Sequence, residues 1–215
     1  MSEKMLKPGR DLLLRIREAF LGHGYDGLSM VTLAKACGFT RRSLYNYFNN
    51  KEDAFRALIR FDNIDFIQSG LEAGQRVRQR GGGALDVLAE TMDVRYGYAR
   101  RILSHSPHAV ELTAEVQRRC RDILIEVATT FQMELEGLLI SLERDGLLRL
   151  RPDMAHRTAA QMLADGARGV NQSLPPVPSD QFGTRYRDMC GAILYGCALE
   201  RSSSGGAQAH ARTQV

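Results

Sequence analysis

The chain has 215 residues, of which 44% are hydrophobic and 25% are charged. This is enough for a small domain joined to a larger one with its own buried core. No segment approaches the roughly 18 to 20 consecutive apolar residues that a membrane-spanning helix requires, and the early triplet Leu12-Leu13-Leu14 is interrupted by Arg15. We therefore expect no membrane span and no signal peptide, which makes the cytoplasm the expected location.

Positive charge is concentrated at the N-terminal end. Residues 1–60 contain eleven Lys and Arg but only six Asp and Glu, a net charge of +5, whereas the rest of the chain carries a net charge of −1. A basic end on a nearly neutral body indicates a polyanionic partner for that end alone.

The predicted secondary structure is helical throughout, because strand-like alternation is nearly absent and apolar residues recur with helical spacing. Ser29, Thr40, Asn50, Asp153 and Ser179 are predicted N-caps. The predicted helices span residues 8–22, 30–37, 41–47, 51–70, 84–103, 113–145, 153–170 and 179–201. The fold class is therefore all-α, with about nine helices, and the Ser/Gly-rich residues 202–215 are predicted to be disordered.

The four cysteines show neither the spacing of a metal site nor a C-x-x-C motif. They are Cys37, Cys120, Cys190 and Cys197. We interpret them as buried free thiols that pack as small apolar side chains, with a redox switch as the alternative. His105 and His108 flank a Ser-Pro turn without a completing ligand, so we expect no metal site and no cofactor.

Within the basic end, residues 30–47 have the pattern of a helix-turn-helix. Gly38 accepts a left-handed turn without steric cost, and the small Ala34 lets the two helices approach. Leu33, Phe39 and Leu44 are predicted to fill the space between the helices. The second of these helices then projects its N-terminal half outward.

The projected surface carries side chains suited to DNA. Arginine is the commonest bidentate reader of guanine in the major groove, so Arg41 and Arg42 are predicted to contact bases. Polar neighbours suit base edges or phosphates; they are Thr40, Ser43, Tyr45, Asn46, Tyr47 and Lys51. The alternatives are a merely solvated helix face, or an architectural protein that binds DNA without sequence preference.

The segment from Gly24 to Glu52 resembles the DNA-binding domain of the tetracycline-repressor (TetR/AcrR) family of bacterial regulators. The matching stretches are residues 24–30, 33–34, 37–40, 43–48 and 51–52. The resemblance implies phosphate contacts and base contacts at separate positions. The phosphate-contacting positions are Ser29, Tyr45, Tyr47 and Lys51, and the base-reading positions are Arg41, Arg42 and Ser43. Val31 and Asn46 depart from the usual pattern, which puts the reading by the second helix in doubt and adds a polar group to the third.

The resemblance also implies two domains with different functions. Residues 1–50 would form the DNA-binding domain, and residues 51–201 a helical domain for ligand binding and dimerisation. The last two helices mix small and apolar residues, which supports a homodimer formed through them; the alternative is an ordinary monomer core. Candidate ligand contacts, with plain core as the alternative, are Met92, Tyr96, Tyr98, Phe131, Met133 and Met162.

The favoured function is that of a ligand-responsive repressor that binds a palindromic DNA operator as a dimer. Its effector is expected to be an apolar or amphipathic small molecule. No catalytic motif is present in the sequence, so we do not expect an enzyme. Two alternatives remain at this point: an activator of the same fold, and a helical ligand-binding protein with a vestigial DNA-binding head.

Overall fold

The computed structural model describes residues 5–196, which form helices and no strands. The all-α prediction is confirmed. The α-helices are α1 (Arg10–His23), α2 (Met30–Ala36), α3 (Arg41–Tyr45), α4 (Lys51–Gln79), α5 (Ala84–Met92), α6 (Tyr98–Ser104), α7 (Ala109–Arg119), α8 (Arg121–Arg144), α9 (His156–Asn171) and α10 (Phe182–Tyr195). A π-helical turn (Asp93–Gly97) joins α5 to α6, and a 3-10 turn (Ser179–Gln181) precedes α10.

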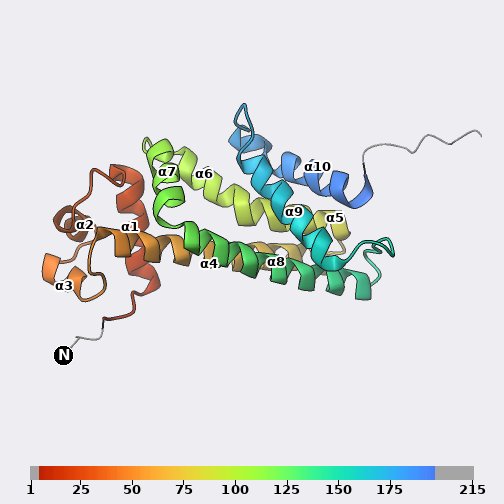
Figure 1. Cartoon of the computed structure of the whole chain (residues 1–215), viewed down its shortest axis with the longest axis horizontal. Coiled ribbons are helices and arrows are strands. Elements are labelled where there is room, and N and C mark those ends of the chain that lie inside the picture. The colour runs from red at the N-terminus through yellow and green to blue at the C-terminus, as the bar shows by residue number, and fades with distance from the viewer. Residues whose placement is uncertain (1–4, 197–215) are drawn as a thin grey trace, which may run out of the picture.

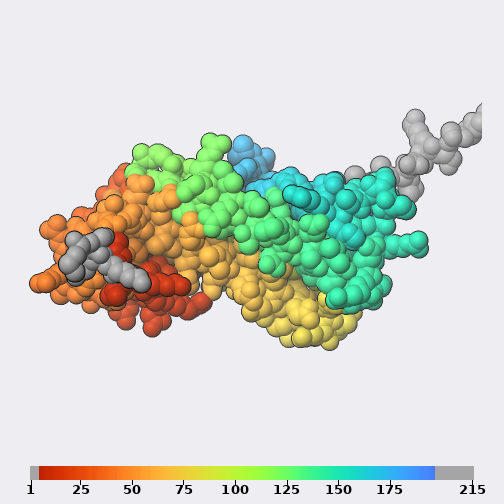
Figure 2. All heavy atoms as spheres, turned by 60° about the horizontal axis from the view of Figure 1, so that its bottom comes forward, coloured from red at the N-terminus to blue at the C-terminus, as the bar shows by residue number. Residues whose placement is uncertain are grey.

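The first three helices form one end of an elongated molecule, and α4 runs from that end into the helical body (Figure 1). The space-filling view shows the same division, with residues of the N-terminal quarter gathered at one end (Figure 2). In the body, α8 packs against α9, and α10 packs against α5 and α9. No helix within residues 5–196 is long and apolar enough to cross a membrane.

Local capping explains where the short helices begin. The side-chain oxygens of Ser29, Thr40 and Asn50 accept hydrogen bonds from backbone N–H groups three residues later, at 3.2, 3.1 and 2.8 Å. These three predicted caps are confirmed. The other two are wrong, because α9 begins after Ala155 without a side-chain cap, and α10 begins at Phe182 after the 3-10 turn.

Helix α4 continues nine residues past its predicted end at Gly70, to Gln79. Its glycines serve close packing instead of termination. A Cβ atom on Gly74 would lie 2.2 Å from the Thr91 hydroxyl oxygen, and one on Gly70 would lie 2.8 Å from the Thr91 carbonyl oxygen. Helix α5 therefore crosses α4 at a distance that only glycine permits.

The helix predicted over residues 113–145 is interrupted, which corrects that prediction. The structure has two helices, α7 and α8, separated at the buried residue Cys120. The guanidinium group of Arg56, on α4, donates to the Arg119 carbonyl oxygen and pairs with the Asp122 carboxylate at 2.6 Å. A side chain distant in sequence thus satisfies the backbone group that the break exposes.

The predicted helix over residues 84–103 is also modified, because the π-helical turn lies in its middle. Three consecutive residues of this turn, Arg95, Tyr96 and Gly97, are buried. The Asp93 carboxylate at its start accepts a hydrogen bond from Arg101 at 2.9 Å. The last helix was predicted to reach Arg201. It ends at Tyr195 within the described residues, and the predicted disordered tail, residues 202–215, lies outside them.

Candidate nucleic-acid interface and effector cavity

The turn between α2 and α3 has the predicted geometry. Gly38 has a φ angle of +71°, in the left-handed region that glycine adopts without strain. The Phe39 N–H donates to the Ala34 carbonyl oxygen at 2.8 Å, and Arg15 of α1 donates to the Cys37 carbonyl oxygen at 3.1 Å. Leu44 is fully buried and fixes the inner face of α3. The outer face of α3 is therefore held in a defined orientation.

The predicted DNA-contacting residues lie together at the N-terminal end, on α2, α3 and the first turn of α4 (Figure 1). Those whose side chains are exposed are Ser29, Thr40, Arg41, Arg42, Tyr45 and Asn46, and those that are half-buried are Ser43, Tyr47 and Lys51. Their contact with DNA stays a prediction, and the geometry it requires is present.

These side chains differ in how free they are. The Arg41 guanidinium lies 5.4 Å from the centre of the Tyr45 ring and 3.4 Å from its hydroxyl, so it folds back along its own helix. The Ser43 hydroxyl lies 2.8 Å from that of Thr40. Arg42 has no hydrogen-bond or ion-pair partner within residues 5–196. Arg42 is therefore the cation of α3 best placed to contact a base.

Lys51 has a structural role that its sequence position did not indicate. Its ammonium group donates to the Tyr25 carbonyl oxygen at 2.7 Å and lies 4.1 Å from the centre of the Tyr25 ring. Tyr47 is likewise packed, at 6.0 Å from the Phe39 ring and 6.3 Å from the Phe48 ring. Both residues hold the α1–α2 turn and α3 in place, and their contact with a phosphate stays a prediction.

The chain segment before α1 is a further part of this surface. The Leu6 N–H donates to the Asn46 carbonyl oxygen at 2.8 Å, so the N-terminal segment lies against the end of α3. Lys7 follows immediately. Sequence reasoning missed this contact, because a backbone hydrogen bond between distant residues has no pattern in the sequence.

Helix α7 holds the α1–α2 turn from the side of the body. The Glu111 carboxylate accepts from the Asp26 N–H at 2.8 Å, and this bond is the main reason that the pKa of Glu111 is lowered. The Arg119 guanidinium lies 4.3 Å from the centre of the Tyr25 ring. Tyr25 is thus stacked with Arg119 and with Lys51, which joins α7, the turn and α4.

A cavity of about 370 Å³ lies between α1, α4, α6, α7, α8 and α9. Of the six residues predicted to line a ligand pocket, Tyr96 lines this cavity. Met92 and Phe131 are fully buried in the core, and the other three side chains are exposed on the surface. The exposed three are Tyr98, Met133 and Met162. The structure therefore does not bring the predicted set together around this cavity.

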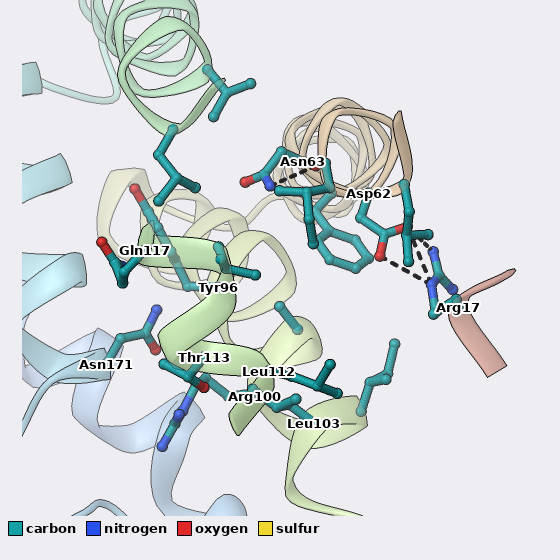
Figure 3. A pocket seen from close by; sticks show the side chains of 18 of the residues that line it. Arg17, Asp62, Asn63, Tyr96, Arg100, Leu103, Leu112, Thr113, Gln117 and Asn171 are labelled. Carbon is teal, nitrogen blue, oxygen red and sulfur yellow. Dashed lines mark hydrogen bonds and ion pairs between the residues drawn. The ribbon is translucent and has the colours of Figure 1, made fainter. Parts of the chain in front are cut away.

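The cavity has polar groups that sequence reasoning did not select (Figure 3). In this view the Arg17–Asp62 ion pair, with an N–O distance of 2.5 Å, lies on one side, and Gln117, Asn171 and Arg100 lie on the other. Burial raises the pKa of Asp62 although Arg17 donates to it. Leucine and aromatic side chains also line the cavity.

The cysteines and histidines form no metal site in the part of the chain that the structure describes. Cys37, Cys120 and Cys190 are buried free thiols, as predicted, and Cys197 lies outside the described residues. Burial raises the pKa of Cys120 to about 11 and that of Cys190 to about 12. These two thiols are therefore protonated and unreactive near neutral pH. The ring of His108 lies 3.2 Å from the Glu111 carboxylate.

Comparisons with known proteins agree with this geometry. Residues 12–58 match the family model described as "Bacterial regulatory proteins, tetR family". The chain is 30% identical over 79 residues to the HTH-type transcriptional repressors AcnR of Corynebacterium efficiens and Corynebacterium glutamicum. Each alignment covers 37% of this chain and 42% of the relative, so the chain matches less than half the length of these curated relatives.

Solved structures share the fold over most of the chain. A putative TetR-family transcriptional regulator from Rhodococcus sp. aligns with a TM-score of 0.63 at 16% identity, covering 86% of this chain and 97% of that one. FadR from Bacillus subtilis, solved in complex with stearoyl-CoA, aligns with a TM-score of 0.60 at 18% identity, covering 87% and 98%. GusR of Salmonella enterica aligns with a TM-score of 0.59 at 25% identity, covering 88% and 98%. The helix-turn-helix geometry and the match of residues 12–58 make the N-terminal end of this chain similar to the TetR family of bacterial regulatory proteins, and solved structures described as members of that family share its fold.

Proposed function

We propose that this protein is a sequence-specific transcriptional repressor that binds a palindromic DNA operator as a homodimer and releases it when a small molecule binds in its body. The observation that carries the proposal is the left-handed turn at Gly38, which presents Arg42 to solvent at the start of α3. Both curated relatives bear the name repressor, which favours repression over activation. Residues 1–50 would read DNA, and residues 51–201 would bind the effector and the partner subunit.

The experiment that tests DNA reading uses Arg42→Ala with Arg149→Ala as control. Arg149 is an exposed arginine of the body, so its removal changes the net charge equally without touching α3. Sites are first selected from random duplexes by the wild-type protein, and binding is then measured for the selected site and its single-base variants. Loss of a bidentate base contact should remove about 1–3 kcal/mol of discrimination at one position per half-site.

Three results would argue against the proposal. If no sequence is enriched by selection, the protein binds DNA without specificity or does not bind it. If Arg42→Ala weakens binding equally for all sequences, Arg42 contacts a phosphate. If Arg149→Ala has the same effect as Arg42→Ala, the effect is one of overall charge.

The proposed dimer joins α9 and α10 of each subunit. Gly166 of α9 packs so closely on α10 that an added Cβ atom would lie 2.7 Å from the Met189 sulfur, which makes the two helices a compact pair. Met162 and Tyr195 on this pair are 41% and 66% exposed, and Gly169 has open space around it. Exposed apolar residues beside small ones suit a four-helix interface between two subunits.

Sedimentation of Met162→Lys tests this interface, with Met133→Lys as the matched control. Both methionines are exposed, at 41% and 61%, but Met133 lies on α8, outside the proposed interface. We expect Met162→Lys to shift the protein toward monomer and Met133→Lys to sediment like the wild type. A monomeric wild-type protein, or a dimer broken only by Met133→Lys, would contradict the assignment.

The proposed response to a ligand passes through α7. Leu112 and Val116 of α7 line the cavity, while Glu111 and Arg119 of the same helix hold the α1–α2 turn. A molecule that enters the cavity and displaces α7 would therefore move the DNA-binding helices α1 to α3. A difference of a few kcal/mol in ligand affinity between two arrangements is enough for such a response. The stearoyl-CoA complex of the similar FadR structure supports a ligand site in this fold.

A further inference from the structure

Arg95 is a buried charge without a counter-ion among the residues that the structure describes. The residue is 6% exposed and lines the cavity. One terminal nitrogen donates to the Asn63 side-chain oxygen at 3.0 Å, and the guanidinium carbon lies 4.7 Å from the Tyr96 ring centre. The Nε atom has no hydrogen-bond partner in the described part of the chain. No carboxylate within residues 5–196 pairs with Arg95.

Such a group is costly to keep in a protein interior. Burial lowers the pKa of Arg95, yet a guanidinium group does not lose its proton under ordinary conditions. The charge therefore persists in a region where water cannot solvate it fully, and a buried charge is normally paired. The arrangement has a physical reason if an anion occupies the cavity when the protein is at work.

Two more arginines extend the positive site. Arg168 pairs with Asp165 through one terminal nitrogen, but its other terminal nitrogen is buried without a partner. Arg100 has a buried Nε atom without a partner and lies across the cavity from the Arg17–Asp62 pair (Figure 3). Asp62 is the sole carboxylate among the described residues that line the cavity, and Arg17 already binds it.

Apart from uncharged polar side chains such as Gln117 and Asn171, the rest of the lining is apolar. Phe66, Leu103, Leu112 and Val127, from four different helices, face the same space. A small inorganic anion would leave this surface uncovered, whereas a hydrocarbon would leave the arginines unpaired. A ligand with both parts satisfies both surfaces.

We propose that the cavity binds an amphipathic organic anion, whose carboxylate or phosphate group pairs with Arg95 and whose apolar part contacts the leucine and aromatic side chains. This inference rests on the proposed function, because it names the chemical class of the effector. It differs from a purely apolar effector, and it makes Arg95, assisted by Arg168 and Arg100, the residue that selects charge.

Two dyes with the same ring system test the selection of charge. They are 8-anilinonaphthalene-1-sulfonate, which is an anion, and N-phenyl-1-naphthylamine, which lacks the sulfonate. Titrations of the full-length protein followed by fluorescence should show one site per chain for the anion, bound at least about tenfold more tightly than the neutral dye, as expected for a charge-assisted hydrogen bond. Arg95→Met should abolish this preference and leave binding of the neutral dye unchanged.

The controls separate this site from general effects of charge and folding. Arg149→Met removes an exposed arginine of the body and should leave both affinities unchanged. Because Arg95→Met removes an unpaired buried charge, its thermal stability without ligand should equal or exceed that of the wild type. If Arg95→Met does not fold, Arg100→Met supplies the same comparison at the same cavity. Equal affinity of the wild type for the two dyes, or an unchanged preference in the variant, would overturn the proposal.

Displacement of the anionic dye identifies the ligand chemistry. Decanoate and decyl phosphate should displace it, and whichever competes better distinguishes a carboxylate from a phosphate. Decan-1-ol should compete at least about tenfold less well. If inorganic phosphate alone competes as well as decyl phosphate, the apolar half of the proposal is wrong.

These assays contain no DNA, so the two proposals fail separately. If the protein prefers the anionic dye but binds no operator, the proposed anion site is supported and the proposed repressor function is wrong. If it binds an operator but shows no preference for the anionic dye, the repressor function is supported and the anion site is wrong.

Discussion

Replacing Arg119 with alanine is expected to loosen the attachment of helices α1 to α3 to the helical body. Arg119 forms ion pairs with Glu115 and Glu52 and stacks on Tyr25 at 4.3 Å. Its side chain is 22% exposed, and that of Glu52 is 43% exposed, so solvent screens part of the attraction. The stacking contributes about 0.5–1 kcal/mol, and the screened ion pairs together contribute about 1 kcal/mol. The loss should be about 2 kcal/mol.

Urea unfolding followed by circular dichroism measures this loss, which corresponds to a fall in melting temperature of roughly 4–8 °C for a chain of this size. The neighbouring Arg118→Ala is the control, because Arg118 is 62% exposed and, within residues 5–196, forms an ion pair with Glu115 only. It should cost less than about 0.5 kcal/mol. A double-mutant cycle with Tyr25→Leu should give a coupling energy of about 0.5–1 kcal/mol. A coupling energy near zero would contradict a stabilising contact between Arg119 and Tyr25. Equal losses of stability for Arg119→Ala and Arg118→Ala would contradict the special role of Arg119 in joining α7 to α4 and the α1–α2 turn.

Three further predictions test packing, burial and charge. Gly74→Ala should destabilise the protein by about 1–3 kcal/mol, because the added Cβ atom would lie 2.2 Å from the Thr91 hydroxyl oxygen of α5. Gly137→Ala, at a position with open space around it, should instead stabilise the protein by about 0.5–1 kcal/mol. Urea midpoints that move in the same direction for both variants would contradict this. Cys120 and Cys190 should remain unlabelled by iodoacetamide at pH 8 in the native protein and become labelled in denaturant, since burial raises the pKa of each thiol. Mass spectrometry of the peptides that contain them measures the labelling, and rapid labelling of the native protein would contradict this prediction. A hydrogen bond from Arg56 lowers the pKa of Asp122 to about 2, from an ordinary value of 3.8. The stabilising effect of the Asp122 carboxylate should therefore be complete above pH 4 and disappear as the pH falls toward 2. The urea midpoints of the wild type and Asp122→Asn should converge over that range, and a constant difference between them would contradict this prediction.

Helices α1 to α3 were predictable because the determinants of their structure are local. A cap such as Thr40 acts on a backbone N–H three residues away, and Gly38 sets its own φ angle, so neighbouring residues suffice to place both. The buried positions of the N-terminal end, such as Leu44 and Phe48, follow from helical spacing. Most of the surface predicted to face DNA is accordingly exposed, whereas Ser43, Tyr47 and Lys51 are half-buried.

The body was predicted less well because long-range contacts decide its details. The break at Cys120 depends on Arg56, more than 60 residues earlier, whose guanidinium binds the free carbonyl group. The cavity escaped prediction for a different reason. We chose methionines and aromatics because such side chains commonly line ligand sites, yet Met92 belongs to the core and Met133 to the surface. Arg95 was passed over because arginine is rarely buried.

The π-helical turn of residues 93–97 has a consequence for how this regulator can diversify. A turn of this kind amounts to one extra residue inserted in an α-helix, and each residue of an α-helix turns the chain by about 100°. Deletion of a single residue from this turn would rotate Arg95 away from the cavity, while α5 would remain packed against α4. Under the proposed function, a single deletion would therefore change which ligands the cavity accepts while leaving the DNA-facing helix α3 unchanged.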